Sequence, residues 1–539
     1  MQSAIPRGIP IATGDSAGGS PASFTRFTLP FGWSLDEASG GDKMSGCVYR
    51  LDNSSITGDR RKYFTPETAN ALYDRALWLK LDGAGQGPAG TFTFHVDRKA
   101  VAVEIAPPRL VLFEADVRKR KPSVTGTGFL LVDISFPTPK SPEQAPTLDD
   151  LLVINERFRY WRCPWKGHLT KTSQTPSGDV SYQTLLKQLR STEGEDNHPY
   201  FDWWEKLLLF PVEVNDVRYR LLSHDAVNES RGWLVSGKGK TGWIAYSDDR
   251  AFVWTCALTP GGSNDASNFT RTLDPVHGPE WIRLLNVDAT NDEPSLFERK
   301  WSKQRTYTRW KHAGTLYGFT MHSGAMLGAP VAGLPTWQHF SELYFDELLL
   351  LLYLRVSIFR FKAELAGISE DLTQDLRNKA IADRFRDHRA LLTFLTNLYR
   401  FPLLSSQQPG IEMYACMRDA LDIGELFTEV QEEVKTTHEM FELLTTSRMG
   451  EATAFLAIGG LILGVLTTVM TFLAVEDLKR YRPAHELILR FFDPVPRILP
   501  SFLVILLSLA LSLVLAAMLS QRLFGRWWLG RWWHGWFDS

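Results

Sequence analysis

Two stretches near the C-terminus contain no charged residue, "ATAFLAIGGLILGVLTTVMTFLAV" and "ILPSFLVILLSLALSLVLAAMLSQ". Each exceeds the roughly 20 residues that a helix needs to cross the hydrocarbon core of a bilayer. A buried core helix of this length without one charge is uncommon. The sequence therefore predicts two transmembrane helices, at 451–475 and 498–521, joined by a loop at 476–497.

The segments beside the second predicted span are amphipathic. The tail at 522–539 repeats Arg-Trp-Trp, and indole rings favour the headgroup level while arginine pairs with phosphate. We expect an interfacial anchor there, although stacking and cationic side chains would also suit nucleic acid. In the loop, "AHELILRFFD" has one apolar helical face, which predicts an interfacial helix or a connecting helix packed on protein. The anchor residues are Arg526, Trp527, Trp528, Arg531, Trp532 and Trp533.

The region at 335–450 is helical in pattern. The apolar run from Leu348 to Leu354 is too short to span a bilayer and predicts a buried core helix. A second helix is expected over Leu372–Tyr399, ended by the break at Phe401–Gly410. One helix should then run from about Ile411 to Val475, bending at Gly424 or Gly450. Its apolar stripe is Met413, Met417, Leu421, Phe427, Val430, Val434, Phe441 and Leu444.

A second, polar stripe follows the same expected helix at about 100° per residue. A narrow polar face on an apolar span suits a water-filled pathway built from several copies. Close packing is the alternative, because Gly460 and Gly464 form a small-xxx-small motif and threonine hydroxyls can bond to their own helix. The stripe consists of Thr453, Gly460, Gly464, Thr467 and Thr471, continued by Gln431, Lys435, His438 and Glu442.

The N-terminal part predicts an α+β soluble domain at 24–334, or two domains with a boundary near 191–199. Alternating segments such as "TFTFHV", "AVAVEI", "RLVLFEADV", "GFLLVDISF", "GWIAYS" and "AFVWTCAL" predict strands between Gly, Pro and Asp turns. Helices are expected near 66–79, 148–157 and 182–190. The N-terminal run 1–23 is rich in Gly, Ser, Pro and Ala and predicts a flexible tail.

Motifs for catalysis or metal binding are weak. "GDSAGG", with Ser16, has the spacing of a hydrolase nucleophile but too little chain upstream to build that site. The four cysteines have no Cys-x-x-Cys spacing, so neither a disulfide framework nor a zinc site is indicated. Aromatic clusters at His198–Trp204 and Trp161–His168 suit a ligand pocket or a core. With no catalytic constellation, the sequence predicts a protein that is not an enzyme.

Charge excludes a broad nucleic-acid surface. The formal net charge is −2, so no global basic field supports nucleic-acid binding, and "RKRK" at Arg118–Lys121 is typical of a solvated hairpin tip. We expect no nucleic-acid partner. The predicted partners are instead the lipid bilayer, further copies of the chain, and a small-molecule or nucleotide ligand.

An α+β domain, a helical layer, a long helix and two C-terminal spans together resemble the CorA-like family of divalent-cation transporters and channels. The resemblance covers mainly Thr336–Gln521, and "GIEMYACMRDALDIGELFTEVQEEVKTTHEMFELL" is similar to the family's stalk helix. It implies a homopentamer in which the Thr453–Thr471 face lines the pore and His438 and Glu442 face a cytosolic funnel. It further implies transport of a divalent cation such as Mg²⁺, with no other cofactor indicated.

The chain departs from this family where the first predicted span ends. The Gly-Met-Asn signature is absent, and "FLAVEDLKRYRP" stands there instead. Glu476 and Asp477 would attract cations at the pore mouth, but Lys479, Arg480 and Arg482 follow and disfavour divalent cations. The loop carries more Lys and Arg than the tail, which argues against the family's orientation. Because the N-terminal region has no export signal, we expect an inner-membrane protein with both termini cytoplasmic.

Three functions follow as hypotheses. The first is a CorA-like oligomeric ion channel or transporter, gated by the cytosolic domain. The second is a membrane effector of a prokaryotic antiviral defence system, opened by a nucleotide-type messenger that binds the soluble domain. The third is a membrane-tethered scaffold without conduction, in which the polar stripe serves packing alone.

Overall fold

The computed structural model describes the chain as a series of ranges with gaps between them. The chain divides into two compact units, Met1–Glu433 and Val434–Ser539. The described residues are 9–14, 22–35, 49–52, 56, 58–81, 90–96, 99–113, 125–159, 212–214, 217–220, 250–259, 278–289, 292–328, 335–374, 379–401 and 403–474.

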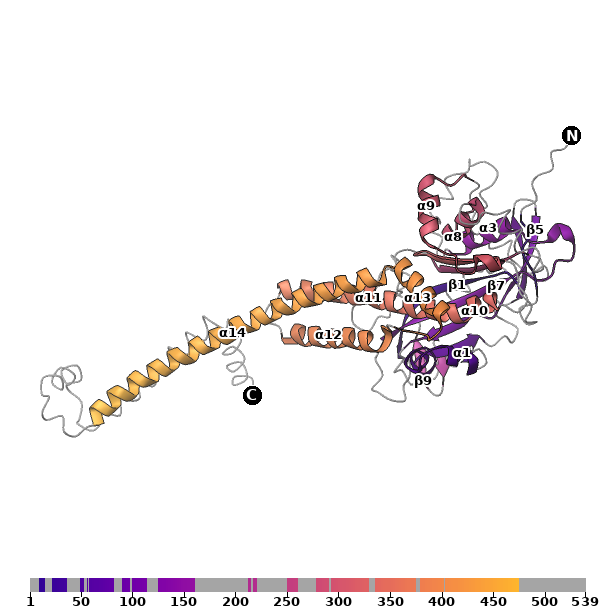
Figure 1. The fold of residues 1–539 in the computed structure, drawn as a ribbon. Coiled ribbons are helices and arrows are strands. Elements are labelled where there is room, and N and C mark those ends of the chain that lie inside the picture. The colour runs from indigo at the N-terminus through magenta and orange to yellow at the C-terminus, as the bar shows by residue number, and fades with distance from the viewer. Residues whose placement is uncertain are drawn as a thin grey trace, which may run out of the picture. The chain divides into compact units, whose positions relative to one another are not determined.

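One mixed 13-stranded sheet organises the first unit (Figure 1). Its main path runs β11-β12-β13-β10-β1-β7-β6-β3-β2, with the hairpins β4-β5 and β8-β9 attached to it. Of the described pairings, β10 with β13 is the parallel one. The strands are β1 Phe24–Leu35, β2 Tyr49–Leu51, β3 Leu77–Leu81, β4 Gly90–Val96, β5 Lys99–Ile105, β6 Arg109–Leu112, β7 Thr125–Ser135, β8 Val212–Val214, β9 Val217–Arg220, β10 Phe252–Leu258, β11 Thr306–Tyr307, β12 Thr315–Phe319 and β13 Ser323–Gly328.

Helices cover both faces of this sheet (Figure 1). Several begin with a cap that the sequence supplies, such as the capping box of Thr147 and Asp150 at the start of α3. The helices are α1 Gly58–Tyr63, α2 Pro66–Ala69, α3 Leu148–Phe158, α8 Pro279–Asn286, α9 Leu296–Gln304, α10 Thr336–Ser341, α11 Leu343–Gln374, α12 Lys379–Tyr399, α13 Gln408–Ala420 and α14 Ile423–Ala474, with the short turns η1 Asn70–Asp74, η2 Pro142–Gln144 and η3 Lys311–Ala313.

The first face of the sheet packs against α3 and α8. Successive residues of a strand point to opposite faces, so Phe27, Leu29 and Phe31 of β1 share this face. They form one buried cluster with Leu152 of α3 and Trp281 of α8. Strand β1 lies near the middle of the sheet and pairs antiparallel with β7 from Phe24 to Ser34. Because apolar residues alternate along these strands, one side of each strand is buried in the core on the first face of the sheet.

The second face packs against α1 and α10–α13. Trp254 of β10 stacks on Phe340 of α10 with ring centroids 4.0 Å apart. Helix α11 is buried all round over Leu348–Leu354, as the uncharged run predicts. On the other side of α11, the stripe Met413, Met417, Leu421, Phe427, Val430 and Val434 is buried, as expected, while Phe441 is half-buried.

The expected fold class is wrong in its membrane part. Among the helices that the structure describes, none is both long enough and apolar enough to cross a membrane. Helix α14 ends at Ala474, and its first half is charged. The second predicted span (498–521), the loop (476–497) and the tail (522–539) lie outside the described residues.

Three local expectations also differ from the structure. The single helix over 411–475 is two helices, α13 and α14, which meet at Leu421 and Asp422, where Asp422 has a positive φ of 53°. Residues 9–14, expected within a flexible tail, hydrogen-bond to the sheet region, and Ile11 is buried. The helix expected near 66–79 ends at Asp74, because β3 begins at Leu77.

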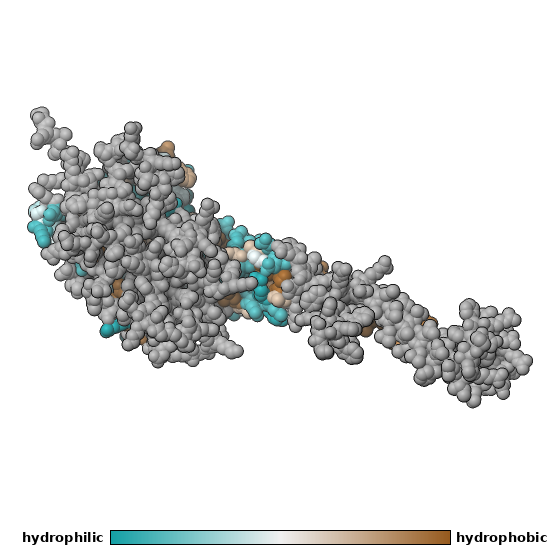
Figure 2. All heavy atoms as spheres, turned by 180° about the vertical axis from the view of Figure 1, so that it is seen from behind, coloured by the Kyte–Doolittle hydropathy of each residue, from teal (hydrophilic) through white to brown (hydrophobic). Residues whose placement is uncertain are grey.

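Exposed apolar residues recur along α14. Leu443, Leu456, Leu461 and Leu463 are each more than 60% exposed. Hydrophobic and hydrophilic residues are interspersed where Figure 2 colours the surface of the helices. Within its own unit, this part of α14 therefore leaves apolar surface uncovered.

Candidate functional site

A cavity of about 700 Å³ opens between the second face of the sheet and the start of α11. Its wall combines β1, β7, α1 and the junction of α10 with α11, segments that are distant in sequence. This volume lies in the range of roughly 300–1,000 Å³ that is typical of small-molecule sites. The cavity is therefore the candidate functional site of the first unit.

Arg26 and Asp133 face each other across β1 and β7 in the wall of this cavity. Arg26 Nε and Nη2 donate to the two carboxylate oxygens of Asp133 at 2.7 and 2.9 Å, and Arg109 Nη2 donates to the same carboxylate at 2.9 Å. Burial alone would raise the pKa of Asp133, but the two guanidinium groups outweigh it and lower the pKa to about 2. Asp133 is thus ionised at neutral pH.

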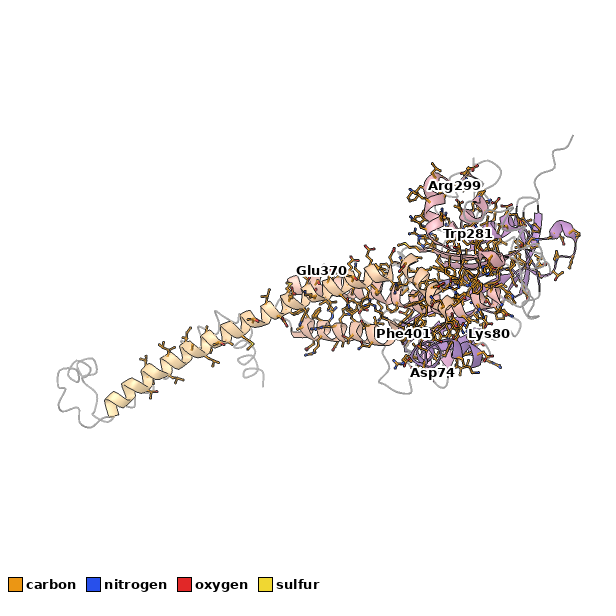
Figure 3. All side chains as sticks on the ribbon, viewed as in Figure 1. Asp74, Lys80, Trp281, Arg299, Glu370 and Phe401 are labelled. Atoms are coloured by element: carbon orange, nitrogen blue, oxygen red, sulfur yellow. The ribbon has the colours of Figure 1, made fainter. Side chains whose placement is uncertain are left out.

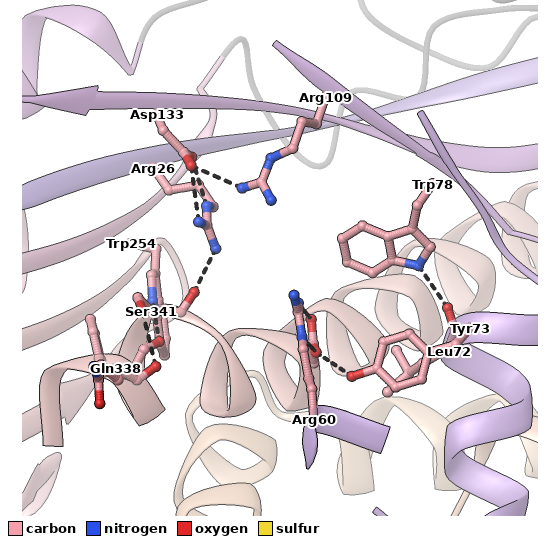
Figure 4. A network of polar contacts seen from close by, with 12 residues as sticks. Arg26, Arg60, Leu72, Tyr73, Trp78, Arg109, Asp133, Trp254, Gln338 and Ser341 are labelled. Carbon is pink, nitrogen blue, oxygen red and sulfur yellow. Dashed lines mark hydrogen bonds and ion pairs between the residues drawn. The ribbon is translucent and has the colours of Figure 1, made fainter. Parts of the chain in front are cut away.

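Arg26 also links the sheet to α10 and α11 through its contacts. Its Nη1 donates to the backbone oxygen of Ser341 at 2.9 Å, at the end of α10. Its guanidinium carbon lies 4.2 Å from the ring centroid of Phe345 in α11. All three nitrogens of this side chain are therefore engaged, and two of its contacts are with the α10–α11 region (Figure 4).

Arg60 forms the opposite wall of the cavity. Its Nε donates to Asp346 Oδ2 at 2.6 Å, and Tyr73 donates its hydroxyl to the same oxygen. Arg60 is 5% exposed and Asp346 is not exposed, so this is a buried ion pair. Burial lowers the pKa of Arg60, but Asp346 raises it further, so that the pKa lies above its usual value. Asp346 belongs to the first turn of α11, which makes this a second link from the cavity wall to that helix.

Arg109 lies beside Asp133, behind the wall of the cavity, and feels the charge of both arginines in that wall. Burial lowers the pKa of Arg109, Asp133 raises it, and the repulsion from Arg26 and Arg60 lowers it further. Asp52 also attracts Arg109, but less than either arginine repels it. The net result is a lowered pKa for Arg109, and burial is its largest cause. An anion bound beside Arg26 and Arg60 would ease the repulsion that these two groups exert on Arg109.

The mouth of the cavity offers a ring and neutral polar groups. Trp337 is half-buried beside the aromatic core of the second face. Burial lowers the pKa of His339, which is therefore neutral at pH 7. Lys62 and Asp59 form an exposed ion pair at the rim, 3.2 Å apart. A ligand that enters would thus meet a flat indole outside and guanidinium groups inside.

A buried carboxyl group lies directly beside this site. Glu347 is not exposed, and its Oε1 accepts a hydrogen bond from Tyr63 at 3.1 Å, while its Oε2 has no hydrogen-bond partner. Burial raises the pKa of Glu347 well above its usual value, so the group is held neutral. Gly410 of α13 lies against it, and a Cβ there would come 3.0 Å from Glu347 Oε1. Asp346 and Glu347 are thus adjacent in sequence but differ in their partners, which are an arginine and a tyrosine for Asp346 and a tyrosine alone for Glu347.

The predicted pore residues lie on α14, and Figure 3 draws the side chains that are described along this helix. Thr453, Gly460, Gly464 and Thr467 are exposed. The hydroxyls of Thr453 and Thr467 donate to the backbone oxygens of Met449 and Leu463, each at 2.7 Å, as the packing alternative supposes. Thr471 lies in α14, but its side chain is outside the described set.

The predicted funnel residues follow α14 toward its N-terminus. Gln431, Lys435 and Glu442 are exposed, and His438 is half-buried. They form ion pairs one turn apart, Lys435 with Glu439 at 3.9 Å and His438 with Glu442 at 3.1 Å. None of these residues belongs to the cavity.

The remaining sequence candidates lie outside the described residues. They are Ser16, the aromatic clusters at 161–168 and 198–204, the pore-mouth residues Glu476 and Asp477, and the anchor residues Arg526, Trp527, Trp528, Arg531, Trp532 and Trp533. In the described part of the chain, no three His, Cys, Asp or Glu side chains are grouped to hold a metal ion.

The cavity residues were missed by sequence reasoning, although signals for them exist. Asp133 interrupts the apolar run "GFLLVDISF", and Asp346 and Glu347 directly precede the uncharged run of α11. Charges inside or beside such buried segments are costly unless they are paired. The partners Arg26 and Arg60 come from segments more than 100 residues away, so only the fold brings them together.

Comparison of the chain with protein-family models, with curated proteins and with solved structures found no match. The resemblance to the CorA-like family therefore stays a prediction.

Proposed function

We propose that the first unit is a ligand-binding regulatory domain, and that its cavity takes a small nucleotide-type anion. The observation that carries this is that the guanidinium groups of Arg26 and Arg60 line one cavity, which also includes Lys62. Guanidinium groups match phosphate oxygens in geometry and charge. A phosphate group fits the buried end of the cavity for that reason.

The mouth supports a ligand with a planar ring. Trp337 can stack on a base, while Gln338, His339 and Gln407 line the same opening and supply polar groups for its edges. The volume of about 700 Å³ accommodates a nucleotide. An inorganic phosphate alone would leave most of that space empty.

Ligand binding would affect α11, because the two arginines of the cavity wall both contact the start of that helix or the residues just before it. Arg26 bonds to Ser341 and Arg60 to Asp346, so a phosphate that competes for either guanidinium shifts the balance of these bonds. Further along α11, Arg355 donates to the backbone oxygen of Leu421 at 3.1 Å, where α13 meets α14. Lys362 pairs with Glu429 at 2.7 Å on α14. Helix α11 thus connects the cavity to the start of α14.

The proposed function retains one part of the defence-effector hypothesis, namely that the N-terminal domain binds a nucleotide-type ligand. A membrane-crossing pore does not enter it, since the described helices provide no span. Transport of Mg²⁺ does not enter it either, and the cavity is proposed as a binding site without catalysis.

The test is binding to the full-length chain. Cyclic dinucleotides, linear dinucleotides, AMP, ATP and inorganic phosphate are each added, and calorimetry and thermal unfolding are recorded. A ligand at about 100 times its Kd stabilises the folded state by about 2.7 kcal/mol. We expect at least one nucleotide to raise the Tm and inorganic phosphate to raise it less.

Two variants locate the binding. Arg26→Gln removes one guanidinium from the lining and Trp337→Ala removes the ring, and each should weaken binding at least tenfold. Lys140→Gln, an exposed lysine away from the cavity, is the control and should bind as the wild type does. Hydrogen exchange at 355–362 and 421–433 should change with ligand. If no nucleotide raises the Tm, or if Arg26→Gln binds normally, this function is wrong.

A further inference from the structure

Helix α9 and the turn after it form a basic surface on a chain of net charge −2. Between Ser295 and His312 the basic residues outnumber the acidic ones, and the single acid there is Glu298. The carboxylate of Glu298 is engaged in the capping box with Ser295, at 2.7 Å from the Ser295 nitrogen. The basic residues are Arg299, Lys300, Lys303, Arg305, Arg309 and Lys311.

The same helix presents two large apolar side chains to solvent. Leu296 is 86% exposed and Phe297 is 73% exposed. The capping box fixes where α9 begins, so both residues are held in its first turn. Ser302 on the opposite side of the helix is buried. Burying the polar side while exposing leucine and phenylalanine is the reverse of what a helix packed only on its own domain needs.

The charges beside this apolar pair are available for a partner. Lys300 and Lys303 are exposed and form no ion pair with any residue that the structure describes. Counting 100° per residue from Leu296, both lysines fall within about 40° of it, on the exposed side. Arg299 and Arg309, by contrast, are paired with Glu293 and Glu412. One face of α9 therefore combines exposed apolar residues with unpaired positive charge.

We infer that this face of α9 binds the surface of a bilayer that contains anionic lipids. Leu296 and Phe297 would enter the acyl boundary, and Lys300 and Lys303 would lie among the phosphate and carboxylate groups of the lipids. This is the chemistry of an interfacial helix, in which apolar burial and attraction to anionic lipid add together. The helix lies on the membrane without crossing it. The surface is separate from the cavity, whose lining includes no residue of α9.

Nucleic acid fits this surface less well. Binding to single strands relies on open aromatic faces on which bases stack. Here the guanidinium carbon of Arg305 lies 4.0 Å from the ring centroid of Trp301 and occupies one face of that indole. Among the large apolar side chains that the structure describes, Leu296 is the most exposed, and it has no ring and gains from apolar burial instead.

The test is flotation of the full-length chain with two kinds of vesicle, phosphatidylcholine alone and phosphatidylcholine with about 30% phosphatidylserine. Other apolar segments of the chain contribute equally to every variant, so the comparison is between variants. We expect Lys300→Gln with Lys303→Gln to bind phosphatidylserine vesicles about 10- to 30-fold more weakly, with little change on neutral vesicles. Leu296→Ser with Phe297→Ser should weaken binding to phosphatidylserine vesicles at least tenfold.

The matched control replaces two exposed lysines elsewhere, Lys80→Gln with Lys140→Gln, and should bind both vesicles as the wild type does. Thermal unfolding checks that each variant is folded. The lysine variant changes only exposed side chains, so it keeps the test decisive even if the apolar variant unfolds. Wild-type binding of the lysine variant to phosphatidylserine vesicles would overturn the inference. So would loss of single-stranded RNA binding in the α9 variants while vesicle binding is unchanged, because the partner would then be a nucleic acid.

Discussion

The two faces of the sheet bury different chemistry. On the first face a neutral hydrogen-bonded triad lies among apolar side chains, in which Thr25 and Thr255 contact Asn155 at 2.7 and 2.9 Å. The ion pair of Arg283 with Asp149 on this face is half exposed on its acidic side. On the second face the core encloses the ion pair of Arg60 and Asp346 among aromatic rings. A buried ion pair contributes little to stability compared with apolar residues of the same volume. Apolar burial therefore accounts for the stability of the first face, whereas the charges of the second face lie where we propose that a ligand binds.

The largest loss of stability is expected when a substitution breaks the ion pair of the second face. Asp346→Asn leaves Arg60 buried without a counter-charge and should destabilise the fold by about 3–5 kcal/mol, measured by urea unfolding. The double variant Arg60→Met with Asp346→Leu should recover most of this loss, yet bind no ligand. A single variant that unfolds like the wild type would show that the two faces do not differ in this way.

A truncation on the first face should separate stability from binding. Leu152 of α3 is fully buried in the first cluster. Leu152→Ala should cost about 2–5 kcal/mol, because it removes apolar contact and leaves a cavity. Ligand affinity of the folded protein, measured by calorimetry well below the Tm, should stay the same. A matching fall in affinity would mean that the first face also takes part in binding.

Acid should weaken the second face selectively. Because the pKa of Asp133 in the fold is about 2, below its usual value of 3.8, its contribution is present at neutral pH and is lost as the pH falls from about 4 to 2. The loss should amount to about 2 kcal/mol. Urea unfolding as a function of pH should show this decline in the wild type and a flatter profile in Asp133→Asn. Equal slopes for both proteins would contradict the contacts described for Asp133.

The smallest change in stability is expected from a substitution just after α13, at a position that belongs to neither face of the sheet. Asp422 has a φ of 53°, a conformation that costs residues other than glycine about 1 kcal/mol. Asp422→Gly should therefore stabilise the chain by about 0.5–1 kcal/mol, partly offset by the greater freedom of glycine when unfolded. Thermal unfolding measures it, with Asp419→Gly inside α13 as a destabilising control. If Asp422→Gly also abolishes the ligand-dependent exchange at 421–433, this turn transmits the signal.

Much of the secondary structure was predictable because its signal is local. The alternation in "AVAVEI" and "AFVWTCAL" gave β5 and β10, and the stripe from Met413 to Val434 gave the buried side of α13 and α14. The break at Leu421 and Asp422 was not foreseen, since glycine at 424 was the expected bend and aspartate adopts a positive φ only rarely.

The candidate site was not predictable for a different reason. Arg26 meets Asp133 only because β1 and β7 pair in one particular register, and a shift by one residue would turn both side chains to the other face. Arg60 meets Asp346 only once α1 packs on α11. Contacts of this kind depend on long-range packing, which a pattern of neighbouring residues does not encode. The prediction of transmembrane helices, by contrast, rested only on the amino-acid composition of short stretches of sequence and used no long-range contact.

The position of β1 near the middle of the sheet has a consequence for how the protein is made. Thr25 of β1 and Thr255 of β10 are 230 residues apart, so translation at about 5–20 residues per second leaves β1 without this neighbour for roughly 10–50 s. During that time the edge of β1 that faces β10 stays open to pairing with other chains, even after β7 has covered the opposite edge. Newly made protein should therefore depend on chaperones that hold the N-terminal strand until the ribosome has released residue 258.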